Sequence, residues 1–189
     1  LCLIFQLKGA TAAGVILVGS CPSGTSSSVM AFLAGGDVAL DVSIEVLSTL
    51  LAPLMLPTLL SVLAGQFIAV PASKLFLSTL QIVVVPIILG VVIHMLLRHK
   101  IDGIIKLMPL ISQVAILLII GAVVSANHAN IFTAATALVI PVVMLHNLCG
   151  YSLGFAFSKL LKLREPQQKA ITFEVGMQDS SLGATLAIK

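Results

Sequence analysis

Two polar segments interrupt otherwise apolar sequence in this chain: Ser20-Cys21-Pro22-Ser23-Gly24-Thr25-Ser26-Ser27-Ser28 and Glu174-Val175-Gly176-Met177-Gln178-Asp179-Ser180-Ser181. Each lies where a membrane helix would otherwise continue. Lipid offers no hydrogen-bond partner to an unwound backbone, so irregular backbone at membrane depth persists only where it lines a cavity in the protein. A Pro- or Gly-interrupted apolar segment in each half of a repeated fold is typical of a binding site near the middle of the bilayer.

The composition excludes a soluble domain. Of the 189 residues, 59% are hydrophobic and 9% are charged, and the mean hydropathy is +1.18. Soluble globular chains carry roughly 25% charged residues. Several apolar stretches exceed the ~20 residues that cross a bilayer. We therefore predict an all-α polytopic membrane protein, with residues 1–189 forming a single membrane region. The absence of Trp and of a basic helix argues against nucleic-acid binding.

The order of apolar and polar stretches predicts the elements. We expect residues 1–7 to end a helix, and spans to follow over residues 10–34, 38–64, 72–97, 103–126 and 130–161 and from 167 onward. The first and the last of these spans contain the two breaks. Asp37 is expected to cap the second span, and a polar loop is expected over residues 162–166. Because the sequence opens inside an apolar run and stops within the second broken helix, we expect it to be a fragment.

The distribution of positive charge predicts the orientation. With loops alternating between the two sides of the membrane, one side receives Lys8 and Lys74, and the other receives Arg98, Lys100, Lys106, Lys159, Lys162, Arg164 and Lys169. Cytoplasmic loops carry the excess of Lys and Arg. The loops at 98–106 and 159–169 are therefore predicted to be cytoplasmic. The two broken helices then run in opposite directions, as inverted-topology repeats require.

Acidic residues stand out in this apolar sequence. Glu174 lies between Phe173 and Val175, where an ionised carboxylate without a partner costs several kcal/mol. Since no Lys or Arg is predicted at that depth, a cation or a proton is the favoured partner. Asp41 and Glu45, four residues apart, lie on one face of the following span. Either they face water in a cytoplasmic vestibule or they join Glu174 around a cation, in which case one of the carboxylates would carry a proton.

Other polar groups allow two interpretations each. The hydroxyls of residues 25–28 and the freed carbonyls of the first break suit a hard cation, while the next half-helix N-terminus favours an anion. Alternatively, the serines bond back to their own backbone in a kinked helix. The presence of a second, matching break favours the binding site. His146, next to Asn147, either bonds to a neighbouring helix or relays protons.

Three runs carry a resemblance to a known family: residues 21–28, Leu145-His146-Asn147 and residues 174–180. They resemble the bile acid:sodium symporter family, particularly its bacterial members, and the similarity extends over essentially the whole chain. The resemblance implies a partial chain of a ten-helix fold, an inverted-repeat transporter with two discontinuous crossing helices, lacking its N-terminal helices and its last helix. Core-type helices would occupy about 1–64 and 130–189, and panel-type helices about 72–126.

The resemblance also implies sites for Na+ and for the solute. A first sodium site would use Ser27, Ser28, Asp41, Glu45 and Glu174. A second sodium site would use Glu174, Val175, Met177 and Gln178. An organic anion would contact Thr25, Ser28 and Asp179.

Three of these positions are acidic where family members commonly carry neutral residues: Asp41, Glu45 and Asp179. The resemblance places Asn at 179 and small hydroxyl residues at 41 and 45. Extra carboxylates oppose an anionic solute by like-charge repulsion. Our hypothesis is that H+ replaces one Na+, or that the solute is neutral or cationic.

The function predicted first is a sodium-coupled symporter of the bacterial inner membrane that imports a small organic solute, preferably an organic anion, by alternating access. A transporter of the same fold that is coupled to protons, or that carries a neutral or cationic solute, is the alternative. An intramembrane enzyme is a remote one, because the chain lacks a paired Gly-x-Gly-Asp motif and a His-Glu-x-x-His motif. A receptor or scaffold would not need polar breaks in two helices.

Overall fold

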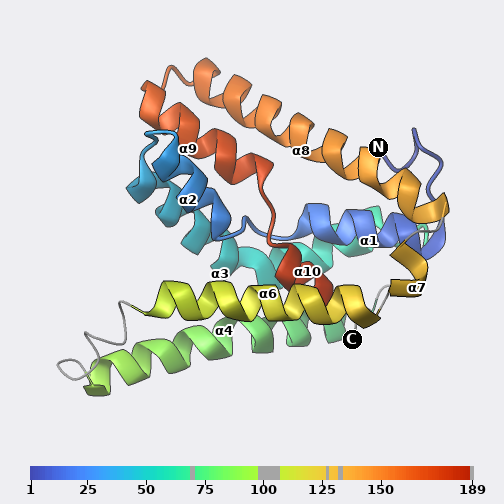
Figure 1. Ribbon diagram of the computed structural model, residues 1–189, viewed down its shortest axis with the longest axis horizontal. Coiled ribbons are helices and arrows are strands. Elements are labelled where there is room, and N and C mark those ends of the chain that lie inside the picture. Colours follow the sequence, from blue (N-terminus) through green and yellow to red (C-terminus); the bar gives the residue numbers. More distant parts are fainter. Residues whose placement is uncertain (69–70, 98–106, 127, 132–133, 188–189) are drawn as a thin grey trace.

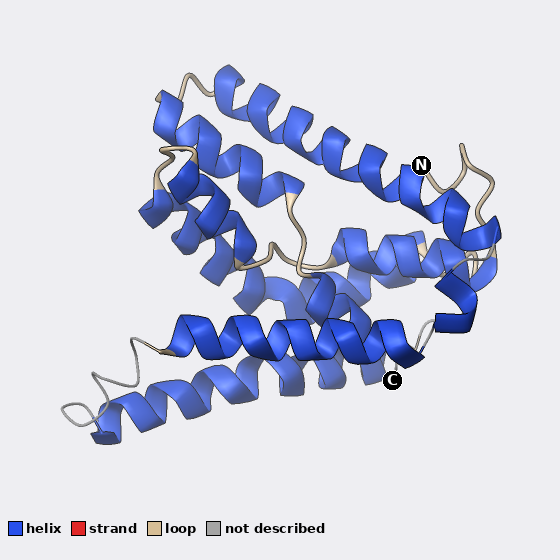
Figure 2. Cartoon of the chain, viewed as in Figure 1, coloured by secondary structure: helices blue, strands red, loops and turns tan. Residues whose placement is uncertain are grey.

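The fold is helical throughout the part of the chain that the computed structural model describes, which comprises residues 1–68, 71–97, 107–126, 128–131 and 134–187. Figure 2 shows these helices joined by short loops. In chain order they are α1 Gly9–Ser20, α2 Ser26–Leu33, α3 Val38–Leu63, α4 Ala72–Leu97, α6 Met108–Ala126, α7 His128–Ile131, α8 Ala134–Leu160, α9 Glu165–Gly176 and α10 Ser180–Ala187.

The surface of the molecule is apolar and part of its interior is polar. Leu117 and Leu118 on α6 are each 69% exposed, whereas Asp41 is fully buried. Among the described residues, three helices are long and apolar enough to cross a membrane, within α3, α4 and α8, and α1 and part of α6 are shorter apolar helices. This distribution fits a polytopic protein whose outer surface meets lipid.

Both predicted broken helices are confirmed. The first span divides into α1 and α2, separated by residues 21–25, and the second divides into α9 and α10, separated by residues 177–179. In Figure 1, α1 begins at the right of the view and α9 begins at the left, and the two breaks meet between them. Helix α9 packs along α8 and also contacts α2 and α3, while α10 contacts α1, α4 and α6.

Helix boundaries confirm some predictions and correct others. Asp37 caps α3, because its Oδ1 accepts a hydrogen bond of 3.1 Å from the Leu40 N–H. Within residues 1–7, predicted to end a helix, residues 2–6 form turns instead. These turns end at Gln6, which has a positive φ of 51°, and α1 starts only at Gly9. The loop predicted over 162–166 is shorter, since α9 starts at Glu165 with Pro166 in its first turn. Proline suits that position because the first helical N–H groups have no intrahelical acceptor.

Glycines allow α8 and α9 to approach closely. A Cβ at Gly154 would lie 2.9 Å from the Ile171 carbonyl oxygen, and a Cβ at Gly150 would lie 2.9 Å from the Val175 carbonyl oxygen. A Cβ at Gly176 would overlap the Tyr151 ring. Small residues let helix backbones come together in membranes. This packing places the last turn of α9, which carries Glu174, against the rest of the bundle.

We predict that Gly176→Ala destabilises the full-length protein, because the new methyl group has no room beside Tyr151. Overpacking of this kind costs about 1–3 kcal/mol, which thermal unfolding in detergent measures as a lowered Tm. Gly90→Ala on α4 is the matched control, since a Cβ there meets nothing within 4 Å. Equal melting temperatures for the two variants would contradict the packing described here.

Candidate functional site

The two helix breaks satisfy each other's backbone. The Gly24 N–H donates to the Met177 carbonyl oxygen at 3.3 Å, and the Asp179 N–H donates to the Pro22 carbonyl oxygen at 2.8 Å. Ser23 and Gln178 form an antiparallel bridge between these bonds. Buried backbone groups must find partners, so each break supplies part of what the other needs. We call the place where the two breaks meet the crossing. It joins two segments that are far apart in the chain: Ser23 and Glu174, for example, are separated by 151 residues.

Three serines beside the first break bind carboxylates from two other helices. The Ser23 hydroxyl donates to Glu174 Oε1, and the Ser27 hydroxyl lies 3.0 Å from Glu174 Oε2 and 3.2 Å from Asp41 Oδ2. Ser28 continues this arrangement with contacts of 2.7 Å to Asp41 Oδ2 and 3.1 Å to Glu45 Oε2. We call this connected set, Ser23, Ser27, Ser28, Asp41, Glu45 and Glu174, the carboxylate–serine chain.

Local structure explains this convergence. Ser27 and Ser28 lie in the first turn of α2, directly after the break. Asp41 and Glu45 lie one turn apart on α3, and Glu174 lies in the last turn of α9. Helices α2, α3 and α9 all pack against one another. The alternative interpretation, in which the serines of the first break bond back to their own backbone, is therefore wrong for Ser27 and Ser28, whose hydroxyls bind carboxylates. It does hold for Ser20, whose hydroxyl donates to the Ile16 carbonyl oxygen at 2.7 Å.

The carboxylate–serine chain lacks positive charge. Asp41 is fully buried, Glu174 is 7% exposed, and Glu45 is half-buried. Among the residues that the structure describes, one ion pair is found, between Lys169 Nζ and Glu165 Oε1 at 2.8 Å. Neither residue belongs to the carboxylate–serine chain. Buried carboxylates without a counter-charge are costly. A cation among these oxygens would lower that cost.

One carboxylate oxygen of this set is left without a hydrogen bond and is a candidate contact for a cation. Asp41 Oδ1 is buried and has no hydrogen-bond partner among the described residues. A serine hydroxyl has a single proton to donate, so Ser27 cannot satisfy Asp41 and Glu174 at the same time. No group of three or more His, Cys, Asp and Glu side chains converges on one point within the described part of the chain. The oxygens on offer are hydroxyls and carboxylates in alternation, which is a donor set suited to a hard cation such as Na+.

The residues predicted for the second sodium site lie at the crossing itself. The Met177 carbonyl accepts from Gly24, and the Val175 carbonyl accepts from Gln178 Nε2 at 3.3 Å. Each carbonyl oxygen keeps a further lone pair, and the Val175 oxygen lies on the α8 side of α9, since a Cβ at Gly150 would come within 2.9 Å of it. The structure thus brings Val175, Met177 and Gln178 beside Glu174.

The residues predicted to contact solute have different surroundings. Asp179 caps α10: its Oδ1 accepts from the Ser181 and Leu182 N–H groups, both at 3.0 Å, and from the Ser181 hydroxyl. Thr25 occupies the N-cap position of α2, but its side chain is exposed and makes no capping bond. The negative charge of Asp179 therefore faces the positive end of a half-helix, an arrangement that the sequence analysis did not identify.

His146 lies outside the carboxylate–serine chain. It packs against Gly19, where a Cβ would come within 2.9 Å of its Cε1 atom, and its Nε2 is buried without a hydrogen bond among the described residues. With Asn147 it lines a cavity of about 330 Å³ between α1, α8 and α10. The structure therefore does not connect His146 to the acidic groups. Conversely, Ser23 was missed as a site residue, although its place between Pro22 and Gly24 in the break was a usable signal.

The chain is similar to known membrane transporters. A family model described as Sodium Bile acid symporter family matches residues 1–134. The uncharacterized sodium-dependent transporter YocS of Bacillus subtilis (strain 168) is 48% identical over 182 residues, covering 96% of this chain and 56% of that protein. The protein of Oryza sativa subsp. japonica named "Probable sodium/metabolite cotransporter BASS1, chloroplastic" is 36% identical, covering 98% of this chain and 46% of its own length. The chain thus spans about half the length of these curated relatives.

We predict that Asp179→Ala and Asp179→Asn differ in stability. Alanine removes the cap of α10, which costs about 1 kcal/mol, whereas asparagine caps a helix nearly as well as aspartate. Thermal unfolding of the two full-length variants measures the difference. If Asp179→Asn unfolded as early as Asp179→Ala, the charge of Asp179, not its capping geometry, would be what the fold requires.

Proposed function

We propose, since the chain belongs to the sodium bile acid symporter family, that the whole protein is a sodium-coupled secondary transporter that imports a small organic solute. The family consists of transporters and not of enzymes. The observation that carries the proposal is the buried carboxylate–serine chain at the meeting point of two broken helices, which has no basic partner among the described residues.

In the first proposed sodium site, the oxygens come from the connected set Ser27, Ser28, Asp41, Glu45 and Glu174. The three carboxylates do not converge on one point in this structure, so binding of Na+ would draw them closer together. Bound Na+ would supply the positive charge that these carboxylates lack. Asp41 Oδ1, which has no other partner, is the oxygen with the most to gain. Ser27 joins α3 to α9 through its two carboxylate contacts, so filling the site would hold these two helices together at α2.

In the second proposed sodium site, Glu174 acts again, with Val175, Met177 and Gln178. Because Glu174 is shared, occupation of the two sites is coupled through one carboxylate. The relatives are named as sodium-dependent or sodium/metabolite proteins, and no observation favours replacing one Na+ by H+. We therefore propose sodium at both sites.

The solute would bind beside the same crossing, near Thr25, Ser28 and Asp179. The N-termini of α2 and α10 both lie there, and helix N-termini favour negative groups. Since Asp179 is already held by α10, the repulsion it exerts on an anion is smaller than its formal charge implies. We propose a small organic anion as the solute.

Transport by this fold requires two states that sodium distinguishes. A ligand shifts a conformational equilibrium only by its difference in affinity for the two states. We propose that core-type helices at about 1–64 and 130–189 move against panel-type helices at about 72–126, with the crossing as the fixed binding centre. Sodium would then stabilise the crossing in the state that accepts solute, and loss of sodium would release both.

The proposed location is the bacterial inner membrane. The loop at 159–169 would be cytoplasmic, and so would the loop at 98–106, which lies outside the described residues. The distribution of Lys and Arg supports this orientation.

We predict that full-length protein in proteoliposomes takes up an organic anion, tested with hexanoate, benzoate and taurocholate, only with an inward sodium gradient. Glu174→Gln removes a charged ligand of both sites and should abolish the sodium stimulation. Ser27→Ala should raise the half-saturating sodium concentration about tenfold, the equivalent of one hydrogen bond to a charged group.

The matched control is Ser43→Ala, because the Ser43 hydroxyl is exposed and donates to the Ala39 carbonyl of its own helix at 2.6 Å. This variant should transport like the unmodified protein. Uptake that is indifferent to sodium, or Glu174→Gln that transports as before, would refute the proposed function.

A further inference from the structure

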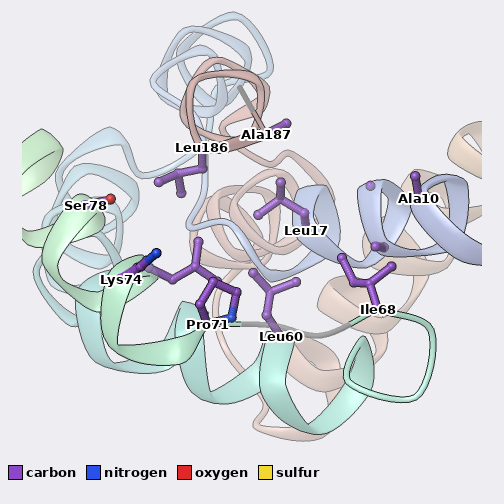
Figure 3. Close-up of a pocket in the computed structure, with 12 residues that line it drawn as sticks. Ala10, Leu17, Leu60, Ile68, Pro71, Lys74, Ser78, Leu186 and Ala187 are labelled. Atoms are coloured by element: carbon purple, nitrogen blue, oxygen red, sulfur yellow. The ribbon is translucent and has the colours of Figure 1, made fainter. Parts of the chain in front are cut away.

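A second cavity lies away from the carboxylate–serine chain. It has a volume of about 350 Å³, is partly open, and is lined by α1, the end of α3, Ile68 and Pro71, the first turns of α4 and the end of α10. Leu17, Leu60, Leu75 and Leu186 make its walls largely apolar. Figure 3 shows Lys74 and Ser78 on the α4 side of this cavity and Ala10 and Ile68 on the opposite side. We call it the Lys74 cavity.

Lys74 is the distinctive group of this cavity. Among its described lining residues, Lys74 alone carries a charge. It is exposed, and it makes no ion pair or hydrogen bond with the residues that the structure describes. Ser78 follows four residues later, on the same face of α4. An unpaired ammonium group, a nearby hydroxyl and apolar walls form a surface complementary to a carboxylate that bears a hydrocarbon body.

The cavity is close to the crossing but separate from it. Leu17 and Leu186 also belong to an apolar cluster that contains Cys21 and Leu182, which flank the two breaks. This apolar cluster thus extends from the wall of the Lys74 cavity to the residues beside the crossing. The cavity is also bounded by helices from both predicted parts, α1 and α10 of the core type and α4 of the panel type. Movement of these parts against each other would change its shape.

The cavity carries a positive charge, whereas the residues at and beside the crossing are acidic. The crossing holds Asp41, Glu45, Glu174 and Asp179, which repel an anion until sodium is bound. Lys74 offers a positive group at a distance from these carboxylates, on the side of the membrane opposite the loops predicted to be cytoplasmic. An anion could therefore be selected there before it reaches an acidic site.

We propose that the Lys74 cavity is an entry site for the solute, in which the Lys74 ammonium group pairs with the carboxylate of a small organic anion. Ser78 donates a hydrogen bond to the same carboxylate, and the leucine walls cover the hydrocarbon part. The volume lies at the lower end of the ~300–1,000 Å³ of small-molecule sites, which favours a small body. This inference rests on the proposed function and adds to it a recognition residue for the solute.

Uptake by the full-length protein in proteoliposomes tests the proposal. Lys74→Gln should raise the KM for hexanoate or benzoate about fivefold, the value of a good solvent-exposed ion pair, and leave the half-saturating sodium concentration unchanged. Lys74→Arg keeps the charge and should restore the KM. Lys8→Gln is the control, because Lys8 is exposed on the same predicted side and does not line the cavity. An unchanged KM in Lys74→Gln would overturn the entry site.

Chemical protection gives a second measurement that does not require transport. Ala10→Cys, which lines the cavity and leaves Lys74 in place, is labelled with a charged methanethiosulfonate reagent, and labelling at position 10 is followed by peptide mass spectrometry. Hexanoate should slow labelling, whereas hexanamide and hexylamine should not. Equal labelling rates with all three compounds would overturn the entry site. Failure of sodium to drive uptake would instead refute the proposed function, so the two failures are distinguishable.

Discussion

Two buried carboxylates and a half-buried one, without a basic partner among the residues that the structure describes, form the constraint on which the rest of this structure depends. Glu174 and Asp41 lie in the interior and share hydroxyl groups of one half-helix. In a low-dielectric environment such groups are unfavourable unless a counter-charge reaches them. The break after α1 delivers Ser23, Ser27 and Ser28 to the carboxylates, and the break after α9 ends that helix directly beyond Glu174. Both discontinuities thus contribute to one cluster, and its lack of a counter-charge is the basis on which we propose sodium coupling.

Close packing holds this cluster in place. The breaks bond to each other through Gly24 and Asp179, and a Cβ at Gly24 would lie 3.1 Å from the Gln178 carbonyl oxygen. On the other side of α9, Gly150 and Gly154 admit its backbone against α8. These contacts connect the crossing to α8 and α10, and Ser27 and Ser28 connect it to α3. Connections of this kind are what the proposed coupling of ion binding to solute binding requires.

The sequence sufficed to predict what local chemistry determines. Pro22 and Gly24 mark a break because one lacks an N–H and the other adopts many backbone conformations, and Asp37 is a cap by its position before an apolar run. Glu174 was conspicuous because charge is rare in apolar sequence. Contacts between distant segments were beyond such reasoning. Ser23 reaches Glu174, Asp179 caps α10, and Lys74 faces a cavity formed by three other parts of the chain, none of which leaves a periodic signal. The helix predicted to end within residues 1–7 rested on apolar composition alone, and the turns there end at Gln6, whose positive φ no composition predicts.

Equilibrium binding of ²²Na+ to the purified full-length protein measures whether the carboxylate–serine chain binds sodium. Binding should be saturable, and unlabelled Na+ should displace the label whereas K+ should not. The affinity should fall when Ser27, the residue that joins Asp41 to Glu174, is replaced by alanine. Absence of saturable binding, or binding that is unaffected by loss of the Ser27 hydroxyl, would contradict sodium binding by this chain of groups.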